Sequence, residues 1–235
     1  MGAAAAAFHD SRVRGLKARR ILCDEIWSFI SAKQKNTTSA GRAEGIGHVW
    51  TWIALDADTR LCVSYLVGGR DGGWAWDFMQ DVAARIRRRV QFSTDGHKSY
   101  LEAIEGAFGL DVDLATLHKI YGAAPEEDQH RCNPARNVGY DMKTVIGSPG
   151  AEYVSTSFVE RQNLAMRMST RRFTRLTKKL DNHAHAVALH FLHYNFARIH
   201  KTLRATPAME AGIADHVWTL EEISELRYGN CRTVA

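Results

Sequence analysis

The sequence contains little cysteine and proline, and it lacks a long apolar run. Only four of its 235 residues are Cys and four are Pro, and no two cysteines form a C-x-x-C pair. A zinc knuckle or a disulfide framework is therefore poorly supported, and this cysteine usage is typical of a reducing cytoplasm. The most apolar stretch, residues 61–67, is far too short to cross a bilayer. The N-terminus has no cationic region or cleavage pattern, so we expect neither a membrane protein nor a secreted one.

Acidic residues are almost absent from one part of the chain. Residues 161–204 contain ten Lys and Arg but a single acid, Asp181, whereas the whole chain has a net charge of only +5. A basic segment beside a more acidic remainder indicates a site for a polyanion next to groups that need carboxylates. The alternative is a pair of solvated basic helix faces, which are common.

Hydrophobic periodicity predicts an α/β chain with a mixed sheet. We expect strands over 21–31, 48–57, 61–69 and 90–96, and helices over 74–89, 97–109, about 156–177 and about 182–203. Thr206 with Pro207, and Thr219 with Glu222, carry the cap patterns of two shorter helices. Residues 110–155 are interpreted as an irregular insertion. The chain then divides into a basic N-terminal segment (1–20), a core (21–177) and a helical C-terminal tail (178–235).

Three acids stand out by their positions in these elements. Asp24 lies within the first strand, Asp95 ends a later buried strand, and Glu160 lies near the start of a long helix. Carboxylates from two strands and one helix could hold Mg²⁺ ions, which activate a water or hydroxyl nucleophile and stabilise a leaving oxygen. Each acid also has a structural alternative: a buried ion pair for Asp24, an Asp-Gly turn for Asp95 and a favourable helix N-terminal charge for Glu160.

Around these acids the sequence resembles the DDE transposases, and most closely the bacterial insertion sequence 1 family. The similar blocks are CDEIWSF (23–29), STDGHKSY (93–100), STSFVERQNLAMRMSTRRFTRLT (155–177) and HYNFARIHKTLRATPAMEAG (193–212). The resemblance implies a ribonuclease H-like mixed sheet flanked by helices, and an acidic triad of Asp24, Asp95 and Glu160 that is both catalytic and metal-binding. It also implies Mg²⁺ or Mn²⁺ as cofactor and a homo-oligomer that cleaves and joins double-stranded DNA at transposon ends and target, in the nucleoid-associated cytoplasm of a bacterium. Because only about twenty residues precede the first block, we expect the family's zinc-finger or helix-turn-helix region to be absent from this chain.

Several polar and basic residues near the acids are candidates for DNA contact. They are His97, Lys98, Arg161, Asn163, Arg167, Arg171 and Arg175. Arg167, Arg171 and Arg175 follow an i, i+4, i+8 spacing, so one helix face is expected to contact the DNA backbone. Glu25 is not expected to be a ligand, because strand alternation points it away from the face of Asp24.

Three other functions remain open on the sequence alone. A nuclease of the same fold would cut DNA without joining it. A truncated, inactive or regulatory remnant would bind DNA without turnover. A bland α/β domain with basic helices would show no salt-sensitive binding to DNA.

Overall fold

Six strands form one mixed sheet in the order β3-β2-β1-β4-β5-β6. The computed structural model describes residues 1–33, 36–39, 46–122, 136–173 and 177–228. The strands are β1 (Arg20–Ile30), β2 (Gly47–Asp56), β3 (Cys62–Gly68), β4 (Val90–Thr94), β5 (Val112–Gly122) and β6 (Arg136–Ile146). β1 pairs in parallel with β4 and β4 with β5, whereas the other neighbours are antiparallel. The predicted α/β class is confirmed, and the sheet is consistent with a ribonuclease H-like fold.

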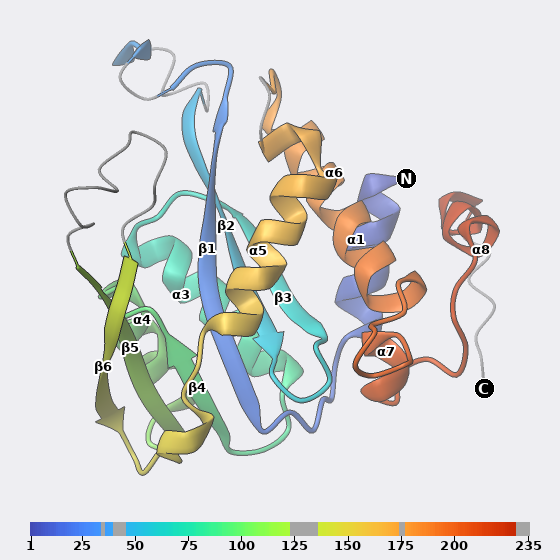
Figure 1. Ribbon diagram of the computed structural model, residues 1–235. Helices are drawn as coiled ribbons and strands as arrows, with labels where there is room; N and C mark the ends of the chain where they lie inside the picture. Colours follow the sequence, from blue (N-terminus) through green and yellow to red (C-terminus); the bar gives the residue numbers. More distant parts are fainter. Residues whose placement is uncertain (34–35, 40–45, 123–135, 174–176, 229–235) are drawn as a thin grey trace.

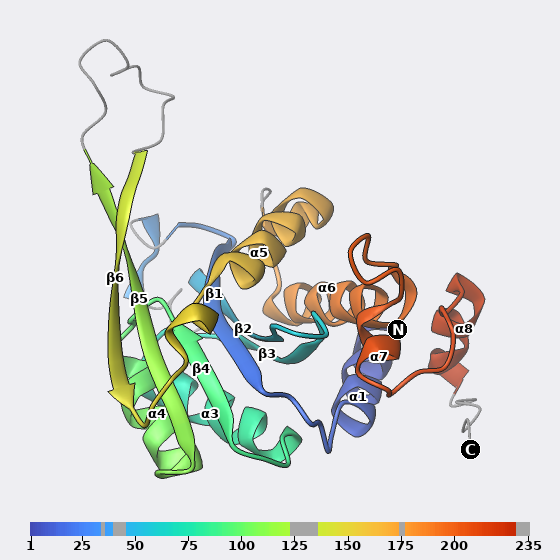
Figure 2. The ribbon, with the colours of Figure 1, turned by 60° about the horizontal axis from the view of Figure 1, so that its bottom comes forward.

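Helices cover both faces of this sheet. The α-helices are α1 (Gly2–Arg12), α3 (Gly72–Arg85), α4 (Ser99–Phe108), α5 (Ser157–Ser169), α6 (Leu180–Leu192), α7 (Pro207–Glu210) and α8 (Leu220–Glu225). Short 3-10 turns span Ala151–Tyr153, Arg171–Phe173 and Leu226–Tyr228, and a π turn spans His193–Ala197. α3 and α4 lie behind the sheet and α5 and α6 in front of it (Figures 1 and 2). Among the described residues, no helix has both the length and the apolarity that a bilayer span requires.

The central strand β1 is buried on both faces because each face meets its own layer of helices. Ile21 and Cys23 pack with the residues of α3, α4 and α1. Leu22 and Ile26 pack with those of α5 and α6. Burial on both faces is the usual condition of a central strand with parallel neighbours. Alternate side chains of β1 therefore point to opposite helical layers of the molecule.

Local sequence signals account for several element boundaries. The side chain of Asp71 caps α3 by accepting hydrogen bonds from the N–H groups of Gly73 and Trp74. Thr206 caps α7, and Thr219 forms the predicted capping box of α8. The predicted hairpin turn between β2 and β3 is also present, since the two strands pair in antiparallel fashion.

The prediction of an irregular insertion over 110–155 is wrong for most of its described residues. Residues 112–122 and 136–146 form β5 and β6, which pair with each other and extend beyond the rest of the sheet (Figure 2). The first half of β5 is buried, including Val112 and Leu114, but in the second half and along β6 apolar side chains such as Ile120 and Tyr140 are exposed, so the pair lacks a continuous apolar pattern. The insertion was predicted from three prolines and an acidic run; Pro125, Pro134 and the acids at 126–128 lie outside the described residues, whereas Pro149 follows the end of β6.

The two long helices predicted for the C-terminal half are shorter than expected. α5 ends at Ser169, where the chain turns extended at Thr170 and Phe173 packs into the core of the front layer. The second helix begins at Leu180 and passes into the π turn, which ends at Ala197. Long-range contacts replace the regular helix there, since the side chain of Asn195 forms hydrogen bonds with both the N–H and the carbonyl of Cys62.

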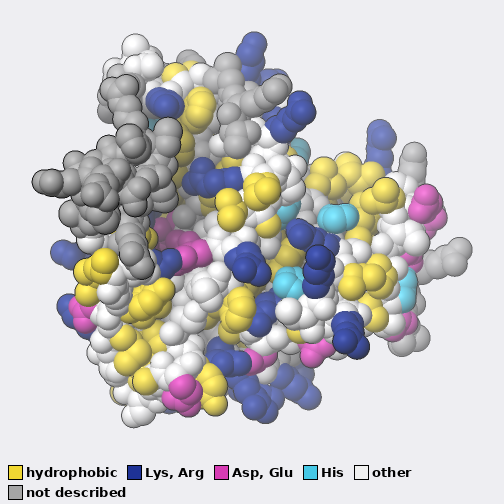
Figure 3. Space-filling view, in the orientation of Figure 1, with side chains coloured by type: hydrophobic (Ala, Val, Ile, Leu, Met, Phe, Trp, Pro, Cys, Tyr) yellow, Lys and Arg dark blue, Asp and Glu magenta, His cyan; other side chains and the backbone are white. Residues whose placement is uncertain are grey.

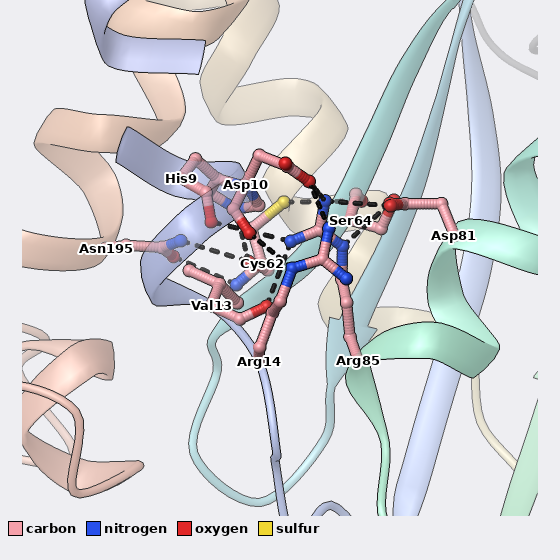
Figure 4. A network of polar contacts seen from close by, with 9 residues as sticks. All are labelled: His9, Asp10, Val13, Arg14, Cys62, Ser64, Asp81, Arg85 and Asn195. Carbon is pink, nitrogen blue, oxygen red and sulfur yellow. Dashed lines mark hydrogen bonds and ion pairs between the residues drawn. The ribbon is translucent and has the colours of Figure 1, made fainter. Parts of the chain in front are cut away.

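A buried polar network fixes α1 to the sheet and to α3 (Figure 4). The guanidinium of Arg85 donates to Asp81, to Asp10 and to the carbonyl of Val13. His9 contacts the carbonyl of Cys62 at 3.1 Å, and burial followed by the charge of Arg85 lowers the pKa of His9 to about 4. His9 is therefore neutral at pH 7, and the network is a structural connection between α1, α3 and β3.

Candidate metal centre

Asp24 and Asp95 lie side by side where β1 and β4 meet. The parallel pairing places Leu22 beside Ser93, and each aspartate follows two residues later on its own side. Glu25 joins them, because one carboxylate oxygen from each of the three acids lies within 4.8 Å of the other two. This acid cluster could hold a metal ion. In Figure 3 acidic side chains are visible in a recess between α5 and the β5–β6 pair.

Glu25 enters the cluster from the opposite layer. Strand alternation holds, since Cys23 belongs to the core behind the sheet and Leu22 to the core in front. However, β4 ends at Thr94, so Asp95 lies beyond the paired part of the sheet, where side chains from both faces of β1 reach it. Glu25 does point to the opposite face of β1 from Asp24, as expected. The expectation that this would keep it out of the site is wrong, because its carboxylate still reaches Asp95 and Asp24.

Arg70 holds the carboxylate of Glu25. Its Nη2 and Nε donate to Oε2 of Glu25 at 2.9 and 3.2 Å, and its guanidinium lies over the ring of Trp50. The other oxygen, Oε1, is buried without a hydrogen-bond partner among the described residues, and so is the hydroxyl of Tyr100. The two groups lie close enough for the Tyr100 hydroxyl to lower the pKa of Glu25 as a donor does, although they fall short of full hydrogen-bond geometry.

Asn163 of α5 reaches the cluster from the front layer. Its Nδ2 donates a hydrogen bond of 2.8 Å to Oδ2 of Asp24, whose Oδ1 accepts from the N–H of Glu25 at 2.9 Å. Oδ1 of Asn163 is buried and has no partner among the described residues. The structure places the Asn163 amide against the acid cluster, and its predicted contact with DNA stays a prediction.

Glu160 lies one turn earlier on α5 but outside the group of three acids. Thr156 donates to its Oε1 at 2.6 Å, and Lys119 of β5 forms an ion pair with its Oε2. Its charge still contributes to raising the pKa of Asp24, although burial, Asp95 and Glu25 contribute more. The structure therefore brings together two members of the predicted triad and holds the third beside Lys119.

The acid cluster is short of positive charge. Burial, followed by the charges of Asp95 and Glu25, raises the pKa of Asp24 from 3.8 to about 7. Burial also raises the pKa of Glu25, although Tyr100 and Arg70 oppose this change. Without a further cation, close carboxylates in a buried site share protons rather than ionise together.

The donor set fits a hard divalent cation. All the available ligands are carboxylate or amide oxygens, which Mg²⁺ and Mn²⁺ prefer. Oε1 of Glu25 and Oδ1 of Asn163 are buried acceptors without partners among the described residues, and an unpaired buried acceptor is costly. Asp24, Glu25 and Asp95 would hold the ion, and Asn163 would orient Asp24.

A tight turn positions Asp95. Its Oδ1 accepts the N–H of His97 at 3.0 Å, and Gly96 between them has φ of +84°. A β-carbon at Gly96 would lie 2.1 Å from the ring of His118, so glycine is needed here both for the positive φ and to leave room for that side chain. His97 packs edge-on against Trp52, and Lys98 is exposed. Their predicted contacts with phosphate stay predictions.

The predicted stripe of arginines is not one helix face. Arg161 is exposed and Arg167 half-buried on α5, but the helix ends at Ser169, so Arg171 lies in the 3-10 turn that follows. Arg175 lies outside the described residues. The i, i+4, i+8 argument fails because the chain turns to bury Phe173.

Sequence reasoning missed the residues that hold the acids in place. Arg70 and Lys119 each pair with a site carboxylate across a large sequence separation. No local signal identifies them, since their role depends on which strands become neighbours. For Glu25 a signal was available, because an acid pair in a buried strand leaves the second charge in need of a partner.

Comparison with known proteins yields no match, either among protein-family models or, at a significant level, among curated proteins.

Proposed function

We propose that this chain is the catalytic domain of a DDE-type transposase, which cleaves DNA and joins its ends with Mg²⁺ or Mn²⁺. The observation that carries the proposal is the meeting of Asp24 and Asp95 from neighbouring parallel strands, with Glu25 within 4.8 Å. The resemblance of the three acidic blocks to the insertion sequence 1 family supports it. Double-stranded DNA at the transposon ends and at the target, and a second copy of the chain, are the proposed partners.

Each residue has a stated task in this proposal. Asp24 and Asp95 hold the ion, Glu25 adds a ligand that Arg70 keeps in place, and Asn163 fixes the direction of Asp24. A bound divalent cation would lower the pKa of an attacking water or 3′-OH and stabilise the leaving oxygen. In cleavage, water forms a bond to phosphorus while the bond to the 3′ oxygen breaks, and that oxygen takes up a proton. In joining, the freed 3′-OH attacks a target phosphodiester and displaces another 3′ oxygen.

The experiment compares cleavage and joining of labelled DNA carrying the element's ends in Mg²⁺, Mn²⁺ and EDTA. Wild type should give both products in metal and neither in EDTA. Asp24→Asn and Asp95→Asn should lose both activities while they keep the fold by circular dichroism. Asp77→Asn, an exposed acid on α3, is the matched control. Cut ends without joined products would indicate a nuclease, and full activity of Asp24→Asn would refute the site.

One observation favours a second candidate, a DNA-binding remnant without turnover. Glu160 is engaged with Lys119 and Thr156 rather than with the acid cluster. If this ion pair blocks activity, Lys119→Met should release Glu160 and increase cleavage. An inactive wild type whose Lys119→Met variant is also inactive would favour the remnant.

A further inference from the structure

Basic side chains from three separate chain segments converge beside α5. The segments are the β2–β3 turn with Arg60, α5 with Arg161, and the stretch after the π turn with Arg198 and His200. Burial lowers the pKa of His200, and the charges of Arg60, Arg198 and Arg161 lower it further. Groups from distant parts of the sequence therefore lie close enough to affect one another. Figure 3 shows Lys, Arg and His side chains together on the face formed by α5 and the C-terminal part of the chain.

Aromatic packing builds this cluster. The guanidinium of Arg60 lies 3.3 Å from the ring centroid of Phe158, in the first turn of α5. The hydroxyl of Tyr194 donates to the carbonyl of Arg60 at 3.0 Å, and the ring of Tyr194 packs edge-on to His200 at 6.3 Å. These contacts connect all three segments. The cations are thus held together by the fold rather than scattered over a mobile surface.

Carboxylates do not neutralise the cluster. Among the described residues, Arg161 and Arg198 form no ion pair and no side-chain hydrogen bond, and both are exposed. Arg60 is half-buried: its guanidinium donates to the carbonyl of Ala57, and the charges of Asp58 and Asp56 act on it, although Asp58 forms its ion pair with Arg20. Exposed guanidinium groups without acidic partners are suited to the oxygens of phosphate.

We propose that Arg60, Arg161, Arg198 and His200 form a binding site for the phosphate backbone of double-stranded DNA. The proposal extends the proposed function by naming a surface of contact with its substrate. Arg161 precedes Asn163 by two residues, which corresponds to about 200° around the helix. The phosphate site and the acid cluster therefore lie on different sides of α5, and the site holds phosphates that flank the cleaved bond.

An extended polyanion fits this site better than a small anion. Arg161 and Arg198 project from an open face, and exposed cations continue beyond them at Lys201 and Arg204. Each phosphate that a cation neutralises releases counterions, so binding should depend steeply on salt and little on sequence.

The test is fluorescence anisotropy with a labelled duplex DNA over a series of salt concentrations in EDTA. Arg161→Ala and Arg198→Ala should each lower the slope of log affinity against log salt by about 0.9, and weaken binding about eightfold at about 0.1 M salt. Arg88→Ala is the matched control, because it removes the same charge from an exposed position between α3 and β4. Arg198→Lys should retain most of the affinity.

Two results would overturn the proposal. Wild-type affinity in both site variants would show that these arginines do not contact DNA. An equal loss of affinity in Arg88→Ala would show that only net charge matters. Tighter binding of an RNA duplex of the same sequence would show that DNA is not the ligand. Because EDTA prevents metal-dependent cleavage, this binding test can succeed or fail independently of the proposed cleavage and joining activity.

Discussion

The side-chain amide of Asn163 donates a hydrogen bond of 2.8 Å to Oδ2 of Asp24 and so connects α5 to the central strand. The contact joins a helix of the front layer to the acid cluster, and it leaves Oδ1 of Asn163 facing a buried site without a partner. Asn163 therefore determines how Asp24 presents its carboxylate, and this role can be measured.

Asn163→Ala should weaken metal binding about 10–100-fold, the usual cost of removing a residue that orients a ligand. The reason is that Asp24 loses its only side-chain donor among the described residues. Isothermal titration calorimetry with Mn²⁺ measures the affinity. Gln162→Ala is the control, because Gln162 is also buried but points about 100° away around the helix, where it contacts His190. Unchanged Mn²⁺ affinity in Asn163→Ala would contradict the assignment.

Asp24→Asn should stabilise the metal-free protein at neutral pH. The pKa of Asp24 is about 7 in the folded protein against an ordinary 3.8, so the folded state keeps a proton that the unfolded chain releases. The free energy of unfolding therefore falls as pH rises between these two values. The variant lacks this penalty and should exceed wild type by about 2–4 kcal/mol above pH 7, with no difference near pH 3.

Urea denaturation in EDTA over a pH series measures this effect, and Asp77→Asn should follow wild type throughout. Added Mg²⁺ should reverse the order, because an ion that binds only the folded wild type stabilises it by mass action. A variant less stable than wild type at neutral pH in EDTA would refute the claim that the Asp24 charge is costly in the apo protein.

Gly96→Ala should destabilise the protein by about 2–4 kcal/mol and reduce Mn²⁺ affinity, since it adds overpacking to an unfavourable backbone conformation. The new β-carbon would meet the ring of His118, and the turn that positions Asp95 would have to shift. Gly109→Ala is the matched control, because Gly109 also has a positive φ but nothing within 4 Å of its β-carbon position. The double variant with His118→Ala should recover part of the lost stability by thermal unfolding.

Asn195→Leu should destabilise the protein by about 2–4 kcal/mol, because the buried N–H of Cys62 loses its partner and the π turn loses its connection to β3. The midpoint of urea unfolding reports the loss. His193→Ala, an exposed change in the same turn, should unfold within experimental error of wild type. Equal stability of both variants would show that the Asn195 contacts contribute little.

The positions of Asp24 and Asp95 could be predicted because they depend on local information. Each lies in or directly after an apolar strand, and parallel strands that are neighbours in the sheet align such residues at the same level. Helix caps at Thr206 and Thr219 could be predicted for the same reason, since the cap and its partner are separated by three residues.

What could not be predicted depends on contacts between distant residues. β5 and β6 were missed because only the first half of β5 is buried, and the rest of the pair is defined by pairing between the two strands rather than by an apolar pattern. The end of α5 was missed because burial of Phe173 outweighs good helix propensity beyond Ser169. The pairing of Glu160 with Lys119 follows from the position of β5, which the sequence pattern did not indicate.

The parallel register of β1 and β4 has a consequence for studies of folding. Side chains alternate between faces, so a slip of one residue between these strands would bring Asp95 level with Cys23 or Glu25 instead of Asp24. A slipped sheet would keep nearly the same secondary structure and would be invisible to circular dichroism. A slip would lower the affinity for Mn²⁺, because Asp24 and Asp95 would no longer lie at the same level. Metal binding can therefore measure correct strand alignment in refolded protein.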